Sequence, residues 1–183
     1  MFNRLFVGRP TPRSAITDVI YTQIVAAARQ PVPYSHWLVP DTPLGRFEMI
    51  GLHMFLFLHR IREEKGAVSE LGQDVTDMFF TEVDHSLREL GIGDVSMPKR
   101  MKKLARMYYG RFESYGGALD AGDEAMLEEA LKRNIRPDAD AWPQAAELAR
   151  YVVAANTALM DQTTDGFCAG QLVFPHAGAG TKG

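Results

Sequence analysis

The sequence predicts an all-helical protein, a single compact domain of about six helices around a buried central helix at about 43–64. Helical spacing of apolar residues runs through almost the whole chain, and no segment alternates convincingly as a strand would. Prolines and glycines stand where helices begin and end. The length of 183 residues suits one domain, which buries about 70% of the surface of its unfolded chain and needs no disulfide.

The residues at the helix ends support this assignment. Thr11-Pro12 places an N-cap residue before a proline at the first helical position, and Asp140 is expected to cap the last helix. Pro31-Val32-Pro33 ends the first helix, since proline removes a backbone donor and clashes with the preceding turn. The helices are expected at about 12–29, 43–64, 68–90, 98–119, 123–133 and 141–160.

The central helix is the most apolar of the six. Asp41 or Thr42 is expected to cap it, and its middle has apolar residues on every side, which is typical of the buried centre of a domain. The connector 34–42 is too apolar for a free loop and is expected to pack over the core. The next helix has the cleanest period, because gaps of three and four align Val68, Leu71, Val75, Met78, Phe79, Val83, Leu87 and Leu90.

The domain is expected to cover residues 1–165. From 166 to 183 the chain is rich in glycine, so this part is expected to be a flexible tail. The single cysteine, Cys168, excludes an internal disulfide and fits a reducing compartment. The longest apolar run, 49–58, is about half of what a membrane span requires, and the first residues do not form a signal peptide. We therefore expect a cytoplasmic protein.

No arrangement of residues indicates catalysis. Cys168 and His176 share the glycine-rich end of the chain, but nothing holds them together as a nucleophile and base. His53 and His59 are six apart on the central helix, whereas metal-binding helices use a spacing of four. His53 is expected to be a hydrogen-bonded core residue. The sequence therefore predicts no enzyme, no metal site and no cofactor.

The helix at 98–119 carries the most informative charges. Its apolar residues fall on one arc, and the opposite arc carries Lys99, Arg100, Lys102, Lys103 and Arg106. The bland interpretation is a solvated helix face, and the functional one is an electrostatic binding surface. The net charge of −3 implies no general attraction to nucleic acid, so candidate partners of this face are ribosomal RNA, anionic lipid headgroups or an acidic protein.

Three strings between about 21 and 134 carry a resemblance to a known family. The first is Pro40-Asp41-Thr42-Pro43-Leu44-Gly45-Arg46-Phe47, and the second is Leu87-Arg88-Glu89-Leu90-Gly91-Ile92-Gly93-Asp94. The third begins with Tyr109-Gly110-Arg111 and continues to Asn134. In this order and spacing they resemble the ubiquinol–cytochrome c chaperone family. The motif residues, which we expect to be mainly structural, are Asp41, Thr42, Gly45, Arg46, Phe47, Arg88, Glu89, Gly91, Gly93, Asp94, Gly110 and Arg111.

The resemblance implies a function in assembly. Mitochondrial members of the family receive newly made cytochrome b near the ribosomal exit, together with a small partner subunit, and help assemble ubiquinol–cytochrome c reductase. This chain resembles a bacterial member. The implied partner is a membrane-protein client, cytochrome b, with a ribosome or membrane surface contacted by the basic face, which would place the protein peripherally at the inner face of the membrane.

Two other classes of function stay open at this point. The basic helix at 98–119 could serve an RNA- or ribosome-binding adaptor without sequence-specific nucleic-acid recognition, and a small-molecule enzyme would need a pocket at His53 or His59. The chaperone interpretation instead needs an apolar groove for the client, for which the candidate lining residues are Trp37, Phe55, Phe57 and Tyr109.

Overall fold

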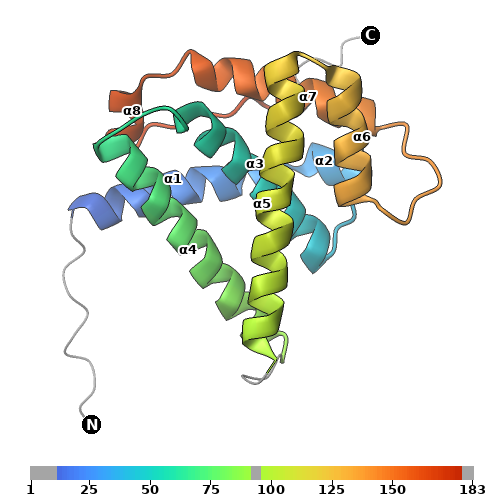
Figure 1. Ribbon diagram of the computed structural model, residues 1–183, viewed down its shortest axis with the longest axis horizontal. Helices are drawn as coiled ribbons and strands as arrows, with labels where there is room; N and C mark the ends of the chain where they lie inside the picture. Colours follow the sequence, from blue (N-terminus) through green and yellow to red (C-terminus); the bar gives the residue numbers. More distant parts are fainter. Residues whose placement is uncertain (1–11, 92–95, 179–183) are drawn as a thin grey trace.

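The computed structural model describes residues 12–91 and 96–178, and within these ranges the chain is helical with no strand (Figure 1). The helices are α1 (Pro12–Ala28), α2 (Pro31–Ser35), α3 (Pro43–Ile61), α4 (Ala67–Glu89), α5 (Met97–Ala121), α6 (Glu124–Ile135), α7 (Ala145–Met160) and α8 (Thr164–Cys168). The six long helices confirm the predicted number, and α2 and α8 add two short ones. None of the helices in the described part of the chain is long and apolar enough to cross a membrane.

Two helix boundaries differ from the sequence prediction. Pro31 begins α2 instead of only ending α1, because a proline at the first helical position has no intrahelical donor to lose. The last long helix begins at Ala145 rather than near 141. Trp142 occupies the turn before it, where its indole Nε1 donates a hydrogen bond to the carbonyl oxygen of Trp37 at 2.7 Å. This bond fastens the apolar connector, in which Trp37 and Val39 pack into the core as expected while Leu38 is exposed.

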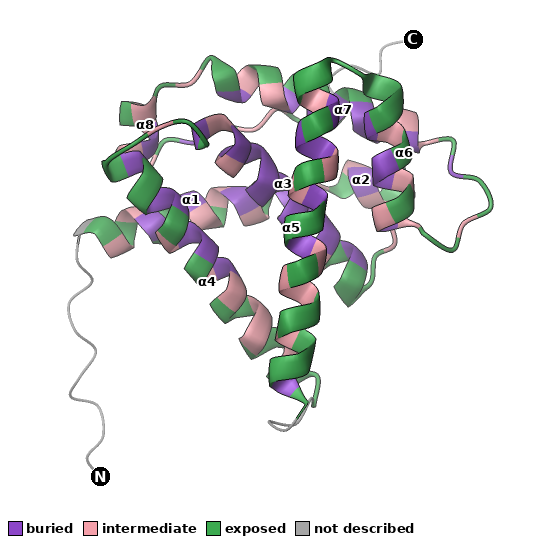
Figure 2. Ribbon diagram, viewed as in Figure 1, coloured by how far each residue is buried: buried purple, intermediate pink, exposed green. Residues whose placement is uncertain are grey.

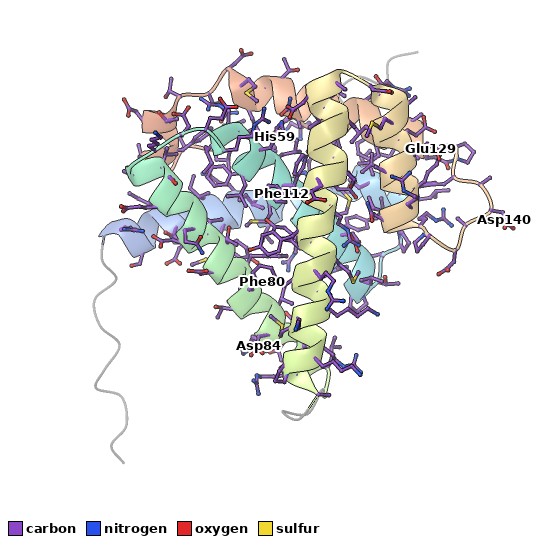
Figure 3. All side chains as sticks on the ribbon, in the orientation of Figure 1. His59, Phe80, Asp84, Phe112, Glu129 and Asp140 are labelled. Atoms are coloured by element: carbon purple, nitrogen blue, oxygen red, sulfur yellow. The ribbon has the colours of Figure 1, made fainter. Side chains whose placement is uncertain are left out.

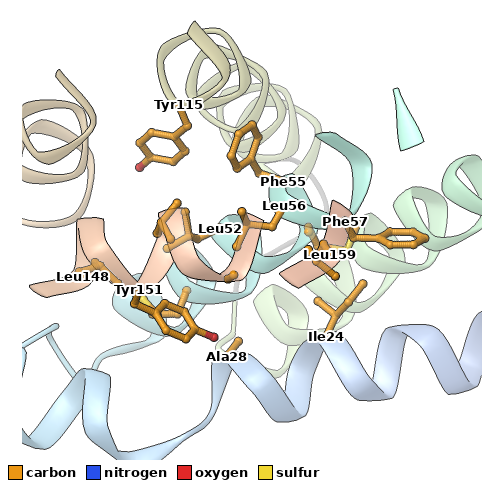
Figure 4. Packing of buried hydrophobic residues seen from close by; sticks show 14 of the residues in the cluster. Ile24, Ala28, Leu52, Phe55, Leu56, Phe57, Tyr115, Leu148, Tyr151 and Leu159 are labelled. Atoms are coloured by element: carbon orange, nitrogen blue, oxygen red, sulfur yellow. The ribbon is translucent and has the colours of Figure 1, made fainter. Parts of the chain in front are cut away.

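Helix α3 is the buried centre of the domain, as the sequence predicted. It contacts α1, α4, α5, α6 and α7, and the burial colouring in Figure 2 runs along most of its length. Figure 4 shows its side chains with Tyr115 of α5 above them and Ile24 of α1 below. Phe55 is 1% exposed and Phe57 is 0% exposed. Full burial of each such side chain stabilises the fold by roughly 1.5–3 kcal/mol, so α3 dictates how the other helices pack.

The C-terminal segment packs against the core instead of forming a free tail from 166 onward. Phe167 is 0% exposed and Leu172 is 4% exposed. The Gln162 side chain both donates to the carbonyl of Val173 and accepts from its backbone N–H. Gln30 of α1 accepts a hydrogen bond from the backbone N–H of Ala177 at 2.7 Å. The scattered glycines suggested a flexible segment. Hydrogen bonds from Gln30 and Gln162 to its backbone instead hold it in place as far as the described residues extend.

Helices α4 and α5 form a hairpin whose closed end projects from the domain. Figure 1 shows the two helices meeting at one end and separating toward the other, where α3 lies. No described residue between 84 and 107 belongs to the main hydrophobic core. We call residues 84–91 and 96–107 the arm. Its surface is largely exposed in Figure 2.

His53 links α3 to α7 inside the core. Its Nδ1 lies 2.8 Å from the carbonyl oxygen of Met49, and its Nε2 lies 2.8 Å from the hydroxyl of Tyr151. Since a carbonyl can only accept, Nδ1 carries the proton and Nε2 accepts from Tyr151. Burial lowers the pKa of His53 from 6.5 to about 4, which keeps the ring neutral. The expectation of a hydrogen-bonded core histidine is confirmed.

His53 should make the fold sensitive to acid. Because its pKa is lower in the folded chain than in the unfolded one, its contribution is complete above pH 6.5 and is lost as the pH falls toward 4. Between pH 7 and pH 5 the loss is about 2 kcal/mol, at about 1.4 kcal/mol per pH unit. Urea unfolding of the wild type and His53→Gln at both pH values measures it.

The variant should lose distinctly less free energy of unfolding over this interval than the wild type. Glu48, whose pKa burial raises to about 7, contributes the opposite trend, because its protonation favours the folded chain as the pH falls. The contribution of Glu48 is the same in the wild type and in His53→Gln, so it cancels when their losses of free energy of unfolding are compared. Equal losses in the two proteins would contradict the assignment to His53.

Candidate functional site

A groove opens where α3, α4 and α5 meet, on the side where the two hairpin helices separate. Its volume is about 240 Å³, enough for a few side chains of a partner. Figure 3 shows Phe80 of α4 and Phe112 of α5 between the two helices. The residues that line the groove are Leu58, Ile61, Arg62, Ser69, Gly72, Gln73, Thr76, Tyr108, Tyr109 and Phe112. We call this the α3–α4–α5 groove.

Aromatic side chains form the α5 wall of the groove. The Tyr108 ring lies 5.3 Å from that of Phe79 and 5.5 Å from that of Phe80, so it joins α5 to α4. Phe112 contacts Phe55 of α3 edge-on at 5.0 Å. Tyr109 differs from these residues because it is 57% exposed. The groove therefore has a rigid aromatic wall with one large aromatic ring open to solvent.

A buried hydroxyl in this wall has no partner among the described residues. Tyr108 is 1% exposed, and its Oη makes no hydrogen bond to them. Burial raises the pKa of Tyr108, so the hydroxyl keeps its proton at neutral pH. An unpaired buried hydroxyl costs about 1–3 kcal/mol. A partner group or a water molecule that reached this oxygen would recover part of that energy.

Close helix packing forms the opposite wall. A Cβ atom on Gly72 would lie 2.7 Å from Cδ1 of Ile61, so the absence of a side chain lets α4 approach α3 here. At the rim, Arg62 donates to Asp120 at 2.9 Å and also contacts His59. Burial and the nearby Arg62 lower the pKa of His59, so this ring is also neutral near pH 7. Polar side chains therefore stand at the rim and along α4, at Ser69, Gln73 and Thr76, and they face the aromatic wall of α5.

Three of the four residues that the sequence suggested for a groove do not line it. Trp37, Phe55 and Phe57 are 3%, 1% and 0% exposed, respectively, and belong to the core. Only Tyr109 stands at the groove. Periodicity could not separate these residues, because α3 is apolar on every side and the pattern does not show which rings the neighbouring helices cover.

The first family string forms the start of α3. Thr42 caps the helix by accepting a hydrogen bond from the backbone N–H of Gly45 at 3.1 Å. Arg46 Nε donates to Asp41 at 2.6 Å and lowers the pKa of that carboxyl. The Phe47 ring stacks on that of Phe79 at 5.6 Å. A second, surface hollow beside this turn is lined by Arg29, Pro31, Tyr34, Ser35, Asp41 and Arg46.

The second string lies at the end of α4. Arg88 donates to Asp84 at 2.7 Å, one helical turn away, so the two residues form a surface pair. Glu89 approaches His85 within 3.6 Å. Gly91 has a φ of 80°, a conformation that favours glycine over other residues. Gly93 and Asp94 lie outside the described residues.

The third string contains two residues with opposite environments. Arg111 is buried and pairs with Glu48 of α3, whose pKa burial raises to about 7 while Arg111 opposes that rise. Gly110 next to it is exposed, and a Cβ atom added there would meet nothing within 4 Å. Packing within the chain therefore accounts for Arg111 but does not account for Gly110.

The basic face lies along the arm. All five of its residues are exposed, and none has an ion pair or hydrogen bond with the described part of the chain. Nitrogen-bearing side chains surround this end of α5 in Figure 3. The face leads directly toward the α3–α4–α5 groove, since Tyr108 and Tyr109 follow it on the same helix. Its members are Lys99, Arg100, Lys102, Lys103 and Arg106.

The helical fold, its capping string and its buried Glu48–Arg111 pair define a class of all-helical domain. A sequence profile described as "Ubiquinol-cytochrome C chaperone" matches residues 35–174. The chain therefore belongs to the ubiquinol–cytochrome c chaperone family. The match begins later than 21 and extends well past 134, so the region beyond Asn134 is part of the family's domain.

Two known proteins resemble the chain. The crystal structure of the Cbp3 homolog from Brucella abortus superposes with a TM-score of 0.87 and 50% sequence identity, over 92% of this chain and 93% of that one. Ubiquinol-cytochrome-c reductase complex assembly factor 1 of Xenopus laevis is 24% identical over 128 residues, which cover 70% of this chain and 63% of that protein. The chain thus spans less than two thirds of the frog protein's length.

The two motif glycines should respond oppositely to the same substitution. A Cβ atom on Gly45 would lie 1.9 Å from the backbone oxygen of Pro40, so Gly45→Ala must displace the turn before α3. We expect it to lower the free energy of unfolding by about 2 kcal/mol or more. Gly110→Ala should raise it by up to about 1 kcal/mol, because alanine favours an exposed helix interior. Urea unfolding measures both, and a destabilised Gly110→Ala would contradict this account.

Proposed function

We propose that the protein is a non-catalytic chaperone that binds cytochrome b during assembly of ubiquinol–cytochrome c reductase. Membership of the ubiquinol–cytochrome c chaperone family supports this proposal, and so does the name of the frog relative, an assembly factor of the reductase complex. The comparisons favour this function over an RNA-binding adaptor. The observation that carries the proposal on this chain is the aromatic α3–α4–α5 groove.

The groove suits an apolar segment of a membrane-protein client. Its wall presents Tyr109, which is 57% exposed, beside Phe112 and the buried Tyr108. An apolar helix docks into such a groove through two or three side chains spaced three or four residues apart. Exposed aromatic residues often dominate the binding energy of such sites. The polar rim at Arg62 would keep the empty groove wetted between clients.

Binding, not catalysis, also fits the titratable side chains. Both ring nitrogens of His53 are engaged inside the core, and His59 is 5% exposed beneath Arg62. Among the described residues, no three His, Cys, Asp or Glu side chains gather as a metal site would require. We propose a cytoplasmic position at the inner face of the membrane, where the client is inserted. The ribosomal exit and a small partner subunit, both implied by the family resemblance, complete the proposed set of contacts.

Capture of the client should depend on Tyr109. We expect Tyr109→Ser to weaken recovery of cytochrome b from detergent-solubilised membranes about thirtyfold, since loss of a dominant aromatic contact costs about 2 kcal/mol. Val173→Ser provides the matched control, because Val173 is 68% exposed and lies outside the groove. Immunoblotting of the captured material against cytochrome b measures the effect.

The control variant should capture the client as well as the wild type does. Recovery of no b-type cytochrome by the wild-type protein would contradict the proposed client. Equal recovery by Tyr109→Ser and the wild type would contradict the groove as its site. Unfolding curves of the three proteins exclude a loss of fold as the cause.

A further inference from the structure

The arm region carries a net charge opposite in sign to that of the rest of the molecule. Residues 84–107 contain six Lys and Arg against three Asp and Glu, a net charge of +3 in a chain whose total is −3. Within the arm, the α4 side neutralises itself through the Arg88–Asp84 pair, whereas the α5 side does not. The five residues of the basic face are exposed and unpaired among the described residues. An anionic surface would therefore attract the arm and repel the body.

Apolar side chains accompany these cations. Leu90, at the end of α4, is 61% exposed. Met101 and Leu104 are half-buried on the arc of α5 opposite the lysines, and Met107 is half-buried on the same side of the helix as Lys103. Residues 84–107 contain no Phe, Tyr or Trp. Recognition of single-stranded RNA relies on stacking of successive bases on aromatic rings, whereas a single exposed ring among the described residues, Tyr109, follows this segment. Lysines flanking leucine and methionine are instead typical of helices that lie on a membrane surface.

We propose that the arm docks on the surface of a bilayer that contains anionic phospholipids. Lys99, Lys102 and Lys103 contact the headgroup phosphates, and the exposed part of Leu90 enters the boundary between headgroups and acyl chains. A cluster of four to eight basic residues beside apolar side chains is sufficient for reversible attachment to an anionic leaflet. The body of the domain, which carries the balancing negative charge, then faces away from the membrane.

This orientation places the groove close to the bilayer. The ten steps along the helix from Lys99 to Tyr109 span about 15 Å, at a rise of about 1.5 Å per residue. A docked arm therefore holds the α3–α4–α5 groove within reach of a segment leaving the membrane surface. This consequence rests on the proposed function, whereas attachment to lipid does not depend on any client.

Vesicle flotation tests the proposal with the full chain alone. The wild-type protein should float with phosphatidylcholine vesicles that contain about one third phosphatidylglycerol, and not with pure phosphatidylcholine. Raising the salt from about 0.1 M to about 1 M should abolish binding, because the screening length falls from about 10 Å to 3 Å. The triple variant Lys99→Gln, Lys102→Gln, Lys103→Gln should bind on the order of a hundredfold more weakly, about fivefold per charge.

A matched triple variant controls for net charge. Lys65→Gln, Arg133→Gln, Arg150→Gln removes the same three charges from exposed positions on the body and should bind as the wild type does. Leu90→Ser should weaken binding without changing charge, and it carries the test if the lysine variant fails to fold. Equal losses in the two triple variants would overturn the proposal, as would equal binding to neutral and anionic vesicles.

Titration with RNA tests whether the basic face prefers nucleic acid to anionic lipid. Homopolymeric single-stranded RNA and an RNA duplex, titrated against the same protein at the same salt, should bind more weakly than the anionic vesicles. Tighter binding to either RNA than to vesicles would overturn the lipid proposal and assign the basic face to nucleic acid. No outcome of these experiments involves cytochrome b, so their failure and the failure of client capture are distinguishable.

Discussion

The enclosure of α3 is the constraint on which the rest of the structure depends. A helix with apolar side chains on every face is stable only when other helices surround it, and α1, α4, α5, α6 and α7 all contact it. Helices α4 and α5 are longer than this enclosure requires, with 23 and 25 residues against the 19 of α3. Their extra length forms the arm, and their divergence over α3 opens the groove.

The family strings divide into residues that the fold explains and residues that it does not. Thr42, Gly45 and Asp41 form the turn and cap at which α3 begins, and Arg111 reaches Glu48 inside the domain. The Arg111–Glu48 pair joins α5 to α3. A Cβ atom at Gly110 would meet nothing within the chain, although glycine weakens a helix at an exposed position. A partner that packs closely on the outer face of α5 would explain why glycine stands there.

Much of this fold follows from the sequence, and much of the site does not. Spacing and end residues predicted the six long helices, because amphipathic patterns record which face is buried. They could not identify the groove, since Phe55 and Tyr109 are equally apolar and differ only in how neighbouring helices cover them. The ordered C-terminal segment was missed for a similar reason, because its side-chain contacts with Gln30 and Gln162 join residues far apart in the chain. The sequence likewise could not show that the five basic residues are exposed and form no ion pair with the described part of the chain, because this depends on where the acidic side chains lie in three dimensions.

Hydrogen–deuterium exchange in the presence and absence of client tests the central claim most directly. A synthetic peptide carrying an apolar segment of cytochrome b should slow exchange in the peptides that cover 58–76 and 104–112, which form the α3–α4–α5 groove. The helices α6 and α7, which lie outside the groove, should exchange at unchanged rates and serve as the internal control. Protection confined to α6, α7 or the C-terminal segment, with none at the groove, would contradict this account.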